Sequence, residues 1–151
     1  MSNKAANYHG ISHQMANDGG RPLKDVLVEF MSDAQKVIET HGGKLIAHHL
    51  EFDAGIIANE MISCGMSKSL ELFEIFTRTG ACTMDPAIGR WVLQCIGKDF
   101  GPSTRMNTLS LKTLVKHLIP EDQKLLENLH SAGTDSLLVL KIVRAIKAVS
   151  G

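Results

Sequence analysis

The sequence has no excess of either charge and no long apolar run. Sixteen Lys and Arg residues balance sixteen Asp and Glu residues, so the formal net charge at pH 7 is zero. A balanced chain has no overall attraction for nucleic acid or for an anionic membrane, although a local binding surface remains compatible with it. No apolar run reaches the length of a membrane span, and residues 1–20 are too polar for a signal peptide. We therefore expect an intracellular protein of the cytoplasm or nucleus, with no membrane partner.

Cysteine is also scarce. Cys64, Cys82 and Cys95 are odd in number and show no C-x-x-C spacing. This excludes a fully paired disulfide framework and the usual ligand spacing of a structural zinc site. The three side chains are expected to be reduced thiols, most of them buried.

Internal repeats and low-complexity segments are absent from the 151 residues. A chain of this length, with 44% apolar residues, is long enough to bury a core and predicts a single domain over residues 1–151. Residues 1–7 are small and polar and are expected to be disordered.

Apolar spacing and capping residues predict mostly helices. The most regular helix is bounded by Pro22 and Gly42, and its predicted buried face is Leu23, Val26, Leu27, Phe30, Ala34, Val37 and Ile38. Short apolar runs predict buried strands at residues 44–47 and 80–84. Further helices are predicted over residues 12–17, 53–64, 86–96, 110–118 and 134–149. Residues 66–77 fit a short helix or an extended cover, and residues 121–129 fit a partly helical linker.

Two histidine-bearing turns each lead into a helix that starts with a carboxylate. His48 and His49 follow the first predicted strand and precede Asp53, whereas His130 precedes Asp135. A charged group just past the carboxyl end of a buried strand lies where open α/β sheets place their ligands. A simpler interpretation is also open, because an acidic first turn favours the helix dipole.

If the two carboxylates converge, their repulsion must be relieved by a cation or a shared proton. Hard oxygen ligands of this kind suit Mg²⁺ or Mn²⁺. A nearby imidazole that titrates near neutrality is able to take a proton from metal-bound water. The residues alone therefore suggest metal-assisted hydrolysis.

The same two stretches resemble motifs of a known enzyme family. Residues 47–53, A-H-H-L-E-F-D, resemble the second exonuclease motif, A-H-N-x-x-F-D. Residues 130–135, H-S-A-G-T-D, resemble the third motif, H-x-A-x-x-D. Both motifs belong to the DEDDh branch of 3′→5′ exonucleases, which includes proofreading subunits and has an RNase H-like fold. Weaker similarity at residues 9–11, 20–30, 83–85 and 109–118 extends the resemblance over most of residues 8–146.

The resemblance implies roles for individual residues. It makes Asp53 and Asp135 metal-site acids and His130 the general base that activates water. The family uses two divalent ions about 3.5–4 Å apart to stabilise the attacking and leaving oxygens at phosphorus. Phe52 is then expected to pack beneath the site. The remaining candidate substrate contacts are His48, His49, which replaces the usual Asn, and Arg105 in the Gly-, Pro- and Ser-rich segment 98–107.

The first motif of the family, D-x-E on a strand, is missing. Only eight residues precede His9, none of them acidic, and no D-x-E occurs anywhere in the sequence. Two of the four metal-binding acids and the first three strands are therefore absent. The strand at residues 44–47 then has an open apolar edge, which favours pairing with another chain.

These features predict an α/β chain with an incomplete RNase H-like fold, mainly helical with one or two short parallel strands. We expect a homo-oligomer, a partner chain that completes the sheet, or a piece of a longer protein. The first functional hypothesis is an exonuclease-type domain that acts on DNA or RNA 3′ ends and is incomplete by itself. The second is a non-catalytic module, derived from an exonuclease, that binds nucleic acid or protein. Fortuitous motif matches are the third.

Overall fold

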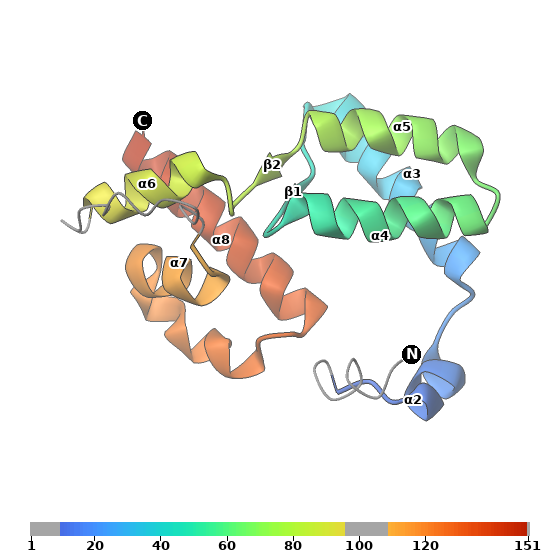
Figure 1. Cartoon of the computed structure of the whole chain (residues 1–151), viewed down its shortest axis with the longest axis horizontal. Helices are drawn as coiled ribbons and strands as arrows, with labels where there is room; N and C mark the ends of the chain where they lie inside the picture. Colours follow the sequence, from blue (N-terminus) through green and yellow to red (C-terminus); the bar gives the residue numbers. More distant parts are fainter. Residues whose placement is uncertain (1–9, 96–108, 151) are drawn as a thin grey trace. The chain divides into compact units, whose positions relative to one another are not determined.

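A computed structural model describes residues 10–95 and 109–150 (Figure 1). The described chain is mainly helical and contains one small parallel sheet, as predicted. In chain order the elements are α2 (His13–Gly19), α3 (Leu23–His41), β1 (Ile46–Ala47), α4 (Leu50–Ser63), α5 (Ser67–Arg78), β2 (Ala81–Cys82), α6 (Pro86–Cys95), α7 (Leu111–Leu118), the 3₁₀ helix η1 (Pro120–Asn128) and α8 (Ala132–Ser150).

Several helix ends follow from single residues that the sequence marks. The Asp85 carboxylate accepts the N–H of Ala87 at 2.7 Å at the start of α6. The Ser110 hydroxyl accepts the N–H of Thr113 at 3.2 Å at the start of α7. Gly42 ends α3 in the left-handed conformation, with φ of 59°. These contacts satisfy backbone groups that have no partner within the helix itself.

The sheet is shorter than predicted but has the predicted parallel direction. Ile46 pairs with Ala81 and Ala47 pairs with Cys82. The N–H of Thr83 adds a further bond to the carbonyl of Ala47 at 2.9 Å, and both chains then turn away. The apolar runs at residues 44–47 and 80–84 therefore overestimate the paired length.

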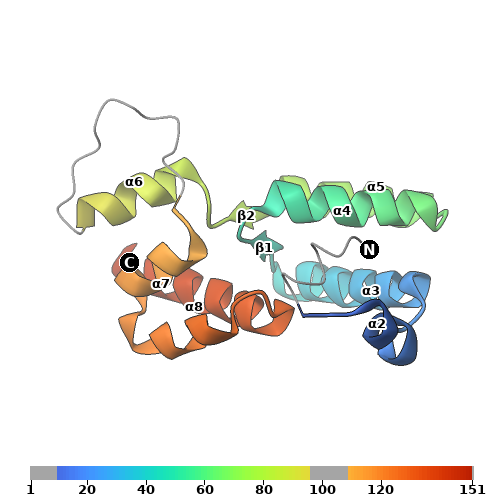
Figure 2. The same cartoon turned by 60° about the horizontal axis from the view of Figure 1, so that its bottom comes forward.

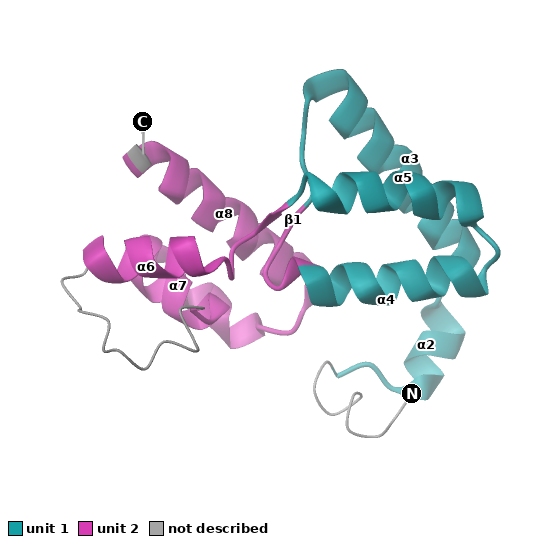
Figure 3. Ribbon diagram, turned by 45° about the horizontal axis from the view of Figure 1, so that its top comes forward, with its two compact units in different colours: residues 1–45, 51–80 teal, residues 46–50, 81–151 magenta. Residues whose placement is uncertain are grey.

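Contacts along the chain divide it into two compact units (Figure 3). The first unit is Met1–Leu45 with Glu51–Gly80, and the second is Ile46–Leu50 with Ala81–Gly151. The whole sheet belongs to the second unit, and the chain between β1 and β2 passes through the first. The single-domain boundary at residues 1–151 stays a prediction.

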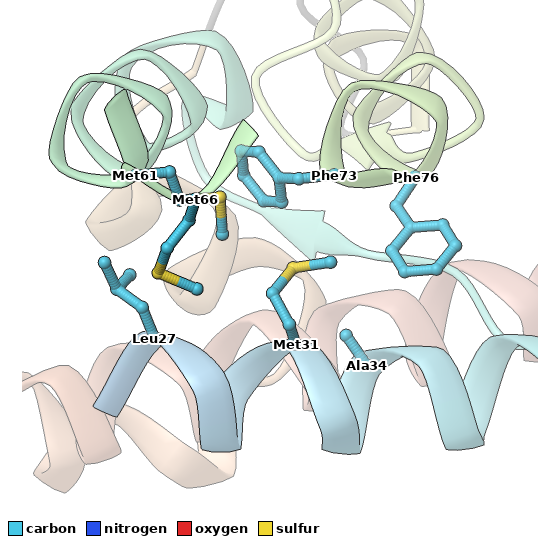
Figure 4. Packing of buried hydrophobic residues seen from close by; sticks show 7 residues of the cluster. All are labelled: Leu27, Met31, Ala34, Met61, Met66, Phe73 and Phe76. Carbon is cyan, nitrogen blue, oxygen red and sulfur yellow. The ribbon is translucent and has the colours of Figure 1, made fainter. Parts of the chain in front are cut away.

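The core of the first unit lies between α3 and the pair α4 and α5 (Figure 4). Its buried side chains are Leu27, Met31, Ala34, Met61, Met66, Phe73 and Phe76. The Phe30 ring meets the Phe73 ring edge-on, with centroids 6.0 Å apart. Such aromatic pairs add to the stabilisation that burial provides.

The predicted buried face of α3 is only partly right. Leu27 and Ala34 are buried, but Leu23, Val26 and Val37 are 45%, 39% and 49% exposed. Met31, which the prediction omitted, is buried instead. The apolar residues of α3 span more of its circumference than α4 and α5 cover, so periodicity alone did not identify the covered stripe.

The core of the second unit is built around α7 and α8 (Figure 2). α7 contacts α6, α8 and η1, and α8 also contacts η1 and β1. The buried side chains are Val92, Leu114, Val115, Ile119, Leu138 and Ile142. The ammonium of Lys141 donates to both carboxylate oxygens of Asp122, at 2.8 and 2.9 Å, which ties α8 to η1. The central position predicted for the last helix agrees with this core.

None of the helices formed by the described residues is long and apolar enough to cross a bilayer. The predictions for residues 1–7, His9, Arg105 and the segment 98–107 lie outside the described residues.

Candidate functional site

Two turns carry the candidate histidines, one with His48 and His49 and the other with His130. Both turns belong to the second unit, which consists of Ile46–Leu50 and Ala81–Gly151. His48 and His49 follow the carboxyl end of β1, and Thr83 follows the carboxyl end of β2. His130 lies in the turn before α8, and Asp135 lies in the first turn of that helix. Because β1 and β2 are parallel, their carboxyl ends lie at the same edge of the sheet.

Thr83 connects the first histidine turn to β2. Its hydroxyl lies 2.9 Å from Nδ1 of His48 and 3.4 Å from the carbonyl oxygen of Ala47. Thr83 is only 2% exposed and is the one buried polar residue among those that the structure describes. A buried hydroxyl requires hydrogen-bond partners, and these two contacts supply them.

Both histidine turns contain a residue in the left-handed conformation. His49 has φ of 77° and His130 has φ of 74°, and no other non-glycine residue of the described chain has a positive φ. This conformation is disfavoured for residues with a Cβ and persists only where surrounding contacts hold it. The N–H of Leu50 donates to Sγ of Cys82 at 3.4 Å, which helps to hold the first turn.

Asp135 has a structural contact of its own. Its Oδ1 accepts the backbone N–H of His130 at 3.3 Å, and its own N–H donates to the carbonyl of Ser131 at 2.9 Å. The carboxylate therefore supports the left-handed His130 turn and lies at the positive end of the α8 dipole. These contacts support the simpler interpretation of this acid that the sequence had left open.

The surroundings of the His48 ring lower its pKa below the ordinary value of 6.5. Burial of the ring is the main cause, and repulsion by His49 contributes in the same direction. Attraction by Asp135 opposes both by raising the pKa, so this carboxylate is close enough to act on the ring electrostatically. His48 is therefore mostly neutral at pH 7.

We expect two variants to shift the His48 pKa in opposite directions. His49→Gln removes a repulsion and should raise this pKa, whereas Asp135→Asn removes an attraction and should lower it. Asn keeps an oxygen acceptor for the His130 N–H, so the turn is retained. NMR titration of the ring protons measures both shifts, and a wild-type midpoint above 6.5 would contradict the burial argument.

The same pKa predicts how stability depends on pH. Between the unfolded pKa near 6.5 and the lower folded value, the unfolded chain binds more protons at His48 than the folded chain does. The contribution of His48 to stability is therefore fully present above pH 6.5 and is lost as the pH falls through this window. Urea unfolding between pH 5 and 7.5 tests the direction, with His48→Gln as the control in which the slope should flatten.

Asp53 and Phe52 lie in the first turn of α4, as predicted, and belong to the first unit. Phe52 is 59% exposed. The convergence of Asp53 with Asp135 and the packing of Phe52 beneath a metal site stay predictions.

The residues that the structure describes do not fit the two-ion site that the resemblance implies. Across residues 10–95 and 109–150, no three His, Cys, Asp or Glu side chains are grouped so that they could hold a metal ion. One oxygen of Asp135 is already engaged by the His130 N–H. Among the described residues, Mg²⁺ or Mn²⁺ therefore has no three-ligand site.

Sequence reasoning missed Thr83 as a site residue and treated it only as the end of a strand. One signal was available, since Thr83 is a hydroxyl residue within the apolar run 80–84, which pairs with the strand before His48.

Comparison with protein-family models, with curated proteins and with solved structures found no match to this chain.

Proposed function

We propose that this chain is part of a 3′→5′ exonuclease-type domain, with an incomplete RNase H-like fold, that binds the 3′ end of a DNA or RNA strand. Hydrolysis of the terminal phosphodiester bond would require the missing D-x-E acids, and with them the Mg²⁺ or Mn²⁺ site. Another chain or another segment has to supply these acids, because the sequence has no D-x-E.

The observation that carries the proposal is the grouping of polar turns in the second unit. His48, Thr83 and the α8 carboxylate Asp135 all belong to this unit, at the strand ends or in the first turn of the helix. Carboxyl ends of parallel strands are the usual ligand edge of an α/β sheet.

The edge of β1 supports completion of the sheet by another chain. The sheet has two strands in the described structure, so β1 has an outer edge with no strand beside it there. Ile46 on β1 is 37% exposed, and Leu137 and Leu140 on α8 are 42% and 44% exposed. A second copy or a partner that adds a strand would cover apolar surface of this kind.

The non-catalytic alternative is favoured by two observations. No group of three potential metal ligands occurs within the described residues, and Asp135 already has a structural partner. A module that binds a strand end without cutting it needs only the polar turns of the second unit.

We expect the purified chain to bind a linear single strand at least about tenfold more tightly than a circular strand of the same sequence, a difference of about 1.4 kcal/mol. A circle has the same bases and phosphates but no end, so it separates recognition of an end from non-specific attraction. Fluorescence anisotropy with internally labelled strands in EDTA measures both affinities. Equal affinity for the circle, or no binding of either strand, would overturn the proposal.

A gel assay with a 5′-labelled strand and Mn²⁺ tests whether the isolated chain cuts a strand without acids from another chain. We expect the isolated chain to leave the strand intact. Shortening that Asp135→Asn abolishes and Asp33→Asn preserves would mean that the chain assembles a complete active site without added acids. Asp33 is a suitable matched control because it is an exposed acid on α3, in the other unit.

A further inference from the structure

The contacts of the Thr83 hydroxyl bear on which nitrogen of His48 carries the proton. A hydroxyl has one proton to donate and accepts through its lone pairs. Here the oxygen has two neighbours within reach, Nδ1 of His48 at 2.9 Å and the Ala47 carbonyl at 3.4 Å. The carbonyl has no proton, so it is only an acceptor.

Two arrangements are compatible with these distances. If the Thr83 hydroxyl donates its proton to Nδ1 of His48, no proton lies between Oγ1 and the Ala47 carbonyl oxygen. Only one hydrogen bond then forms. If the hydroxyl donates to the carbonyl, Nδ1–H donates to the hydroxyl, and two hydrogen bonds form in series. Thr83 is 2% exposed, so water does not compete for its hydroxyl. The arrangement with two bonds is favoured, because in the other arrangement two oxygens face each other at 3.4 Å without a proton between them.

The second arrangement leaves the lone pair of neutral His48 on Nε2. Within the described part of the chain, the ring makes its one hydrogen bond through Nδ1. The ring is only partly buried, so a ligand at this strand edge has access to it. Burial and His49 favour the neutral form of the ring at pH 7.

We propose that Thr83 is a positioning residue that holds His48 with its proton on Nδ1, and that His48 Nε2 accepts a hydrogen bond from a hydroxyl group of the ligand. The ligand assignment rests on the proposed function, in which this group is the terminal 3′-hydroxyl of a nucleic-acid strand. A 3′-phosphate end has no hydroxyl donor in its dianionic form, and it is repelled by the Asp135 carboxylate. The site therefore selects a hydroxyl end.

The first test concerns the proton and requires no ligand. Long-range ¹H–¹⁵N correlation spectra at pH 8 distinguish a protonated ring nitrogen from an unprotonated one. We expect a protonated Nδ1 in the wild type and in Thr83→Ser, which keeps the hydroxyl. Thr83→Val keeps the branched shape but removes the hydroxyl, and should move the proton to Nε2. A wild-type proton on Nε2, or an unchanged tautomer in Thr83→Val, overturns the positioning role.

The second test concerns the ligand and uses strands that differ only at the 3′ end. We expect the wild type to bind a 3′-hydroxyl strand about three- to tenfold more tightly than a dideoxy-terminated or a 3′-phosphorylated strand, as one net hydrogen bond provides. Thr83→Val should lose this preference and Thr83→Ser should keep it. Equal binding of the three linear strands, with the circle still weaker, overturns this inference while the proposed function stands. Failure of every strand to bind overturns the proposed function and the ligand assigned here.

Discussion

Replacing Leu138 by alanine is expected to lower the free energy of unfolding of the second unit by about 2–5 kcal/mol. Leu138 is 0% exposed and packs with Leu114, Val115 and Ile142 in the core around α8. Truncation removes buried apolar surface and leaves a cavity that the surrounding helices fill only in part. Native-state hydrogen exchange of amides in α7 and α8 measures the loss for this unit specifically.

Leu137→Ala is the matched control for this change. Leu137 is the neighbouring residue on the same helix, has the same side chain and is 42% exposed. Its truncation should change stability by no more than about 0.5 kcal/mol, because surface substitutions have small effects. Equal losses at the two positions would mean that α8 does not bury the face described here. Asp135 lies less than one turn before Leu138, so the Leu138 variant should also weaken binding of strand ends.

Phe73→Ala is expected to destabilise the first unit by about 3–5 kcal/mol. The Phe73 ring is 2% exposed, lies among Met31, Met61 and Phe76, and meets Phe30 edge-on. Its loss removes both apolar burial and the aromatic pair. Hydrogen exchange of amides in α3 and α5 reports this change.

The control for Phe73 lies two residues away on α5. Ile75 is 48% exposed, so Ile75→Ala should have a small effect on the same amides. If Phe73→Ala left the exchange of α3 unchanged, the packing of α3 against α5 shown in Figure 4 would be contradicted.

Local rules in the sequence accounted for most element positions. Asp85, Ser110 and Gly42 act within a few residues of themselves, so their effects on helix ends are readable without tertiary contacts. The parallel sheet was also expected, although only Ile46–Ala47 and Ala81–Cys82 pair. Strand length depends on where both partners turn away, which a single apolar run does not encode.

Tertiary contacts decided the buried faces and the contacts of the histidine turns. On α3, Met31 is buried while Val26 is exposed, because burial depends on which side α4 and α5 cover. At the strand ends, Thr83 and His48 are 35 residues apart in sequence and meet only because β1 and β2 pair. No periodicity within either segment specifies that contact.

The sequence by itself determined the mainly helical composition, the helix caps and the positions of the two histidine turns, since each depends on residues close together in the chain. Only the tertiary structure decided that Thr83 contacts His48 and that the described residues form no metal cluster. These features depend on distances between side chains from different elements. Such distances follow from how the elements pack, which a motif in a single stretch does not record.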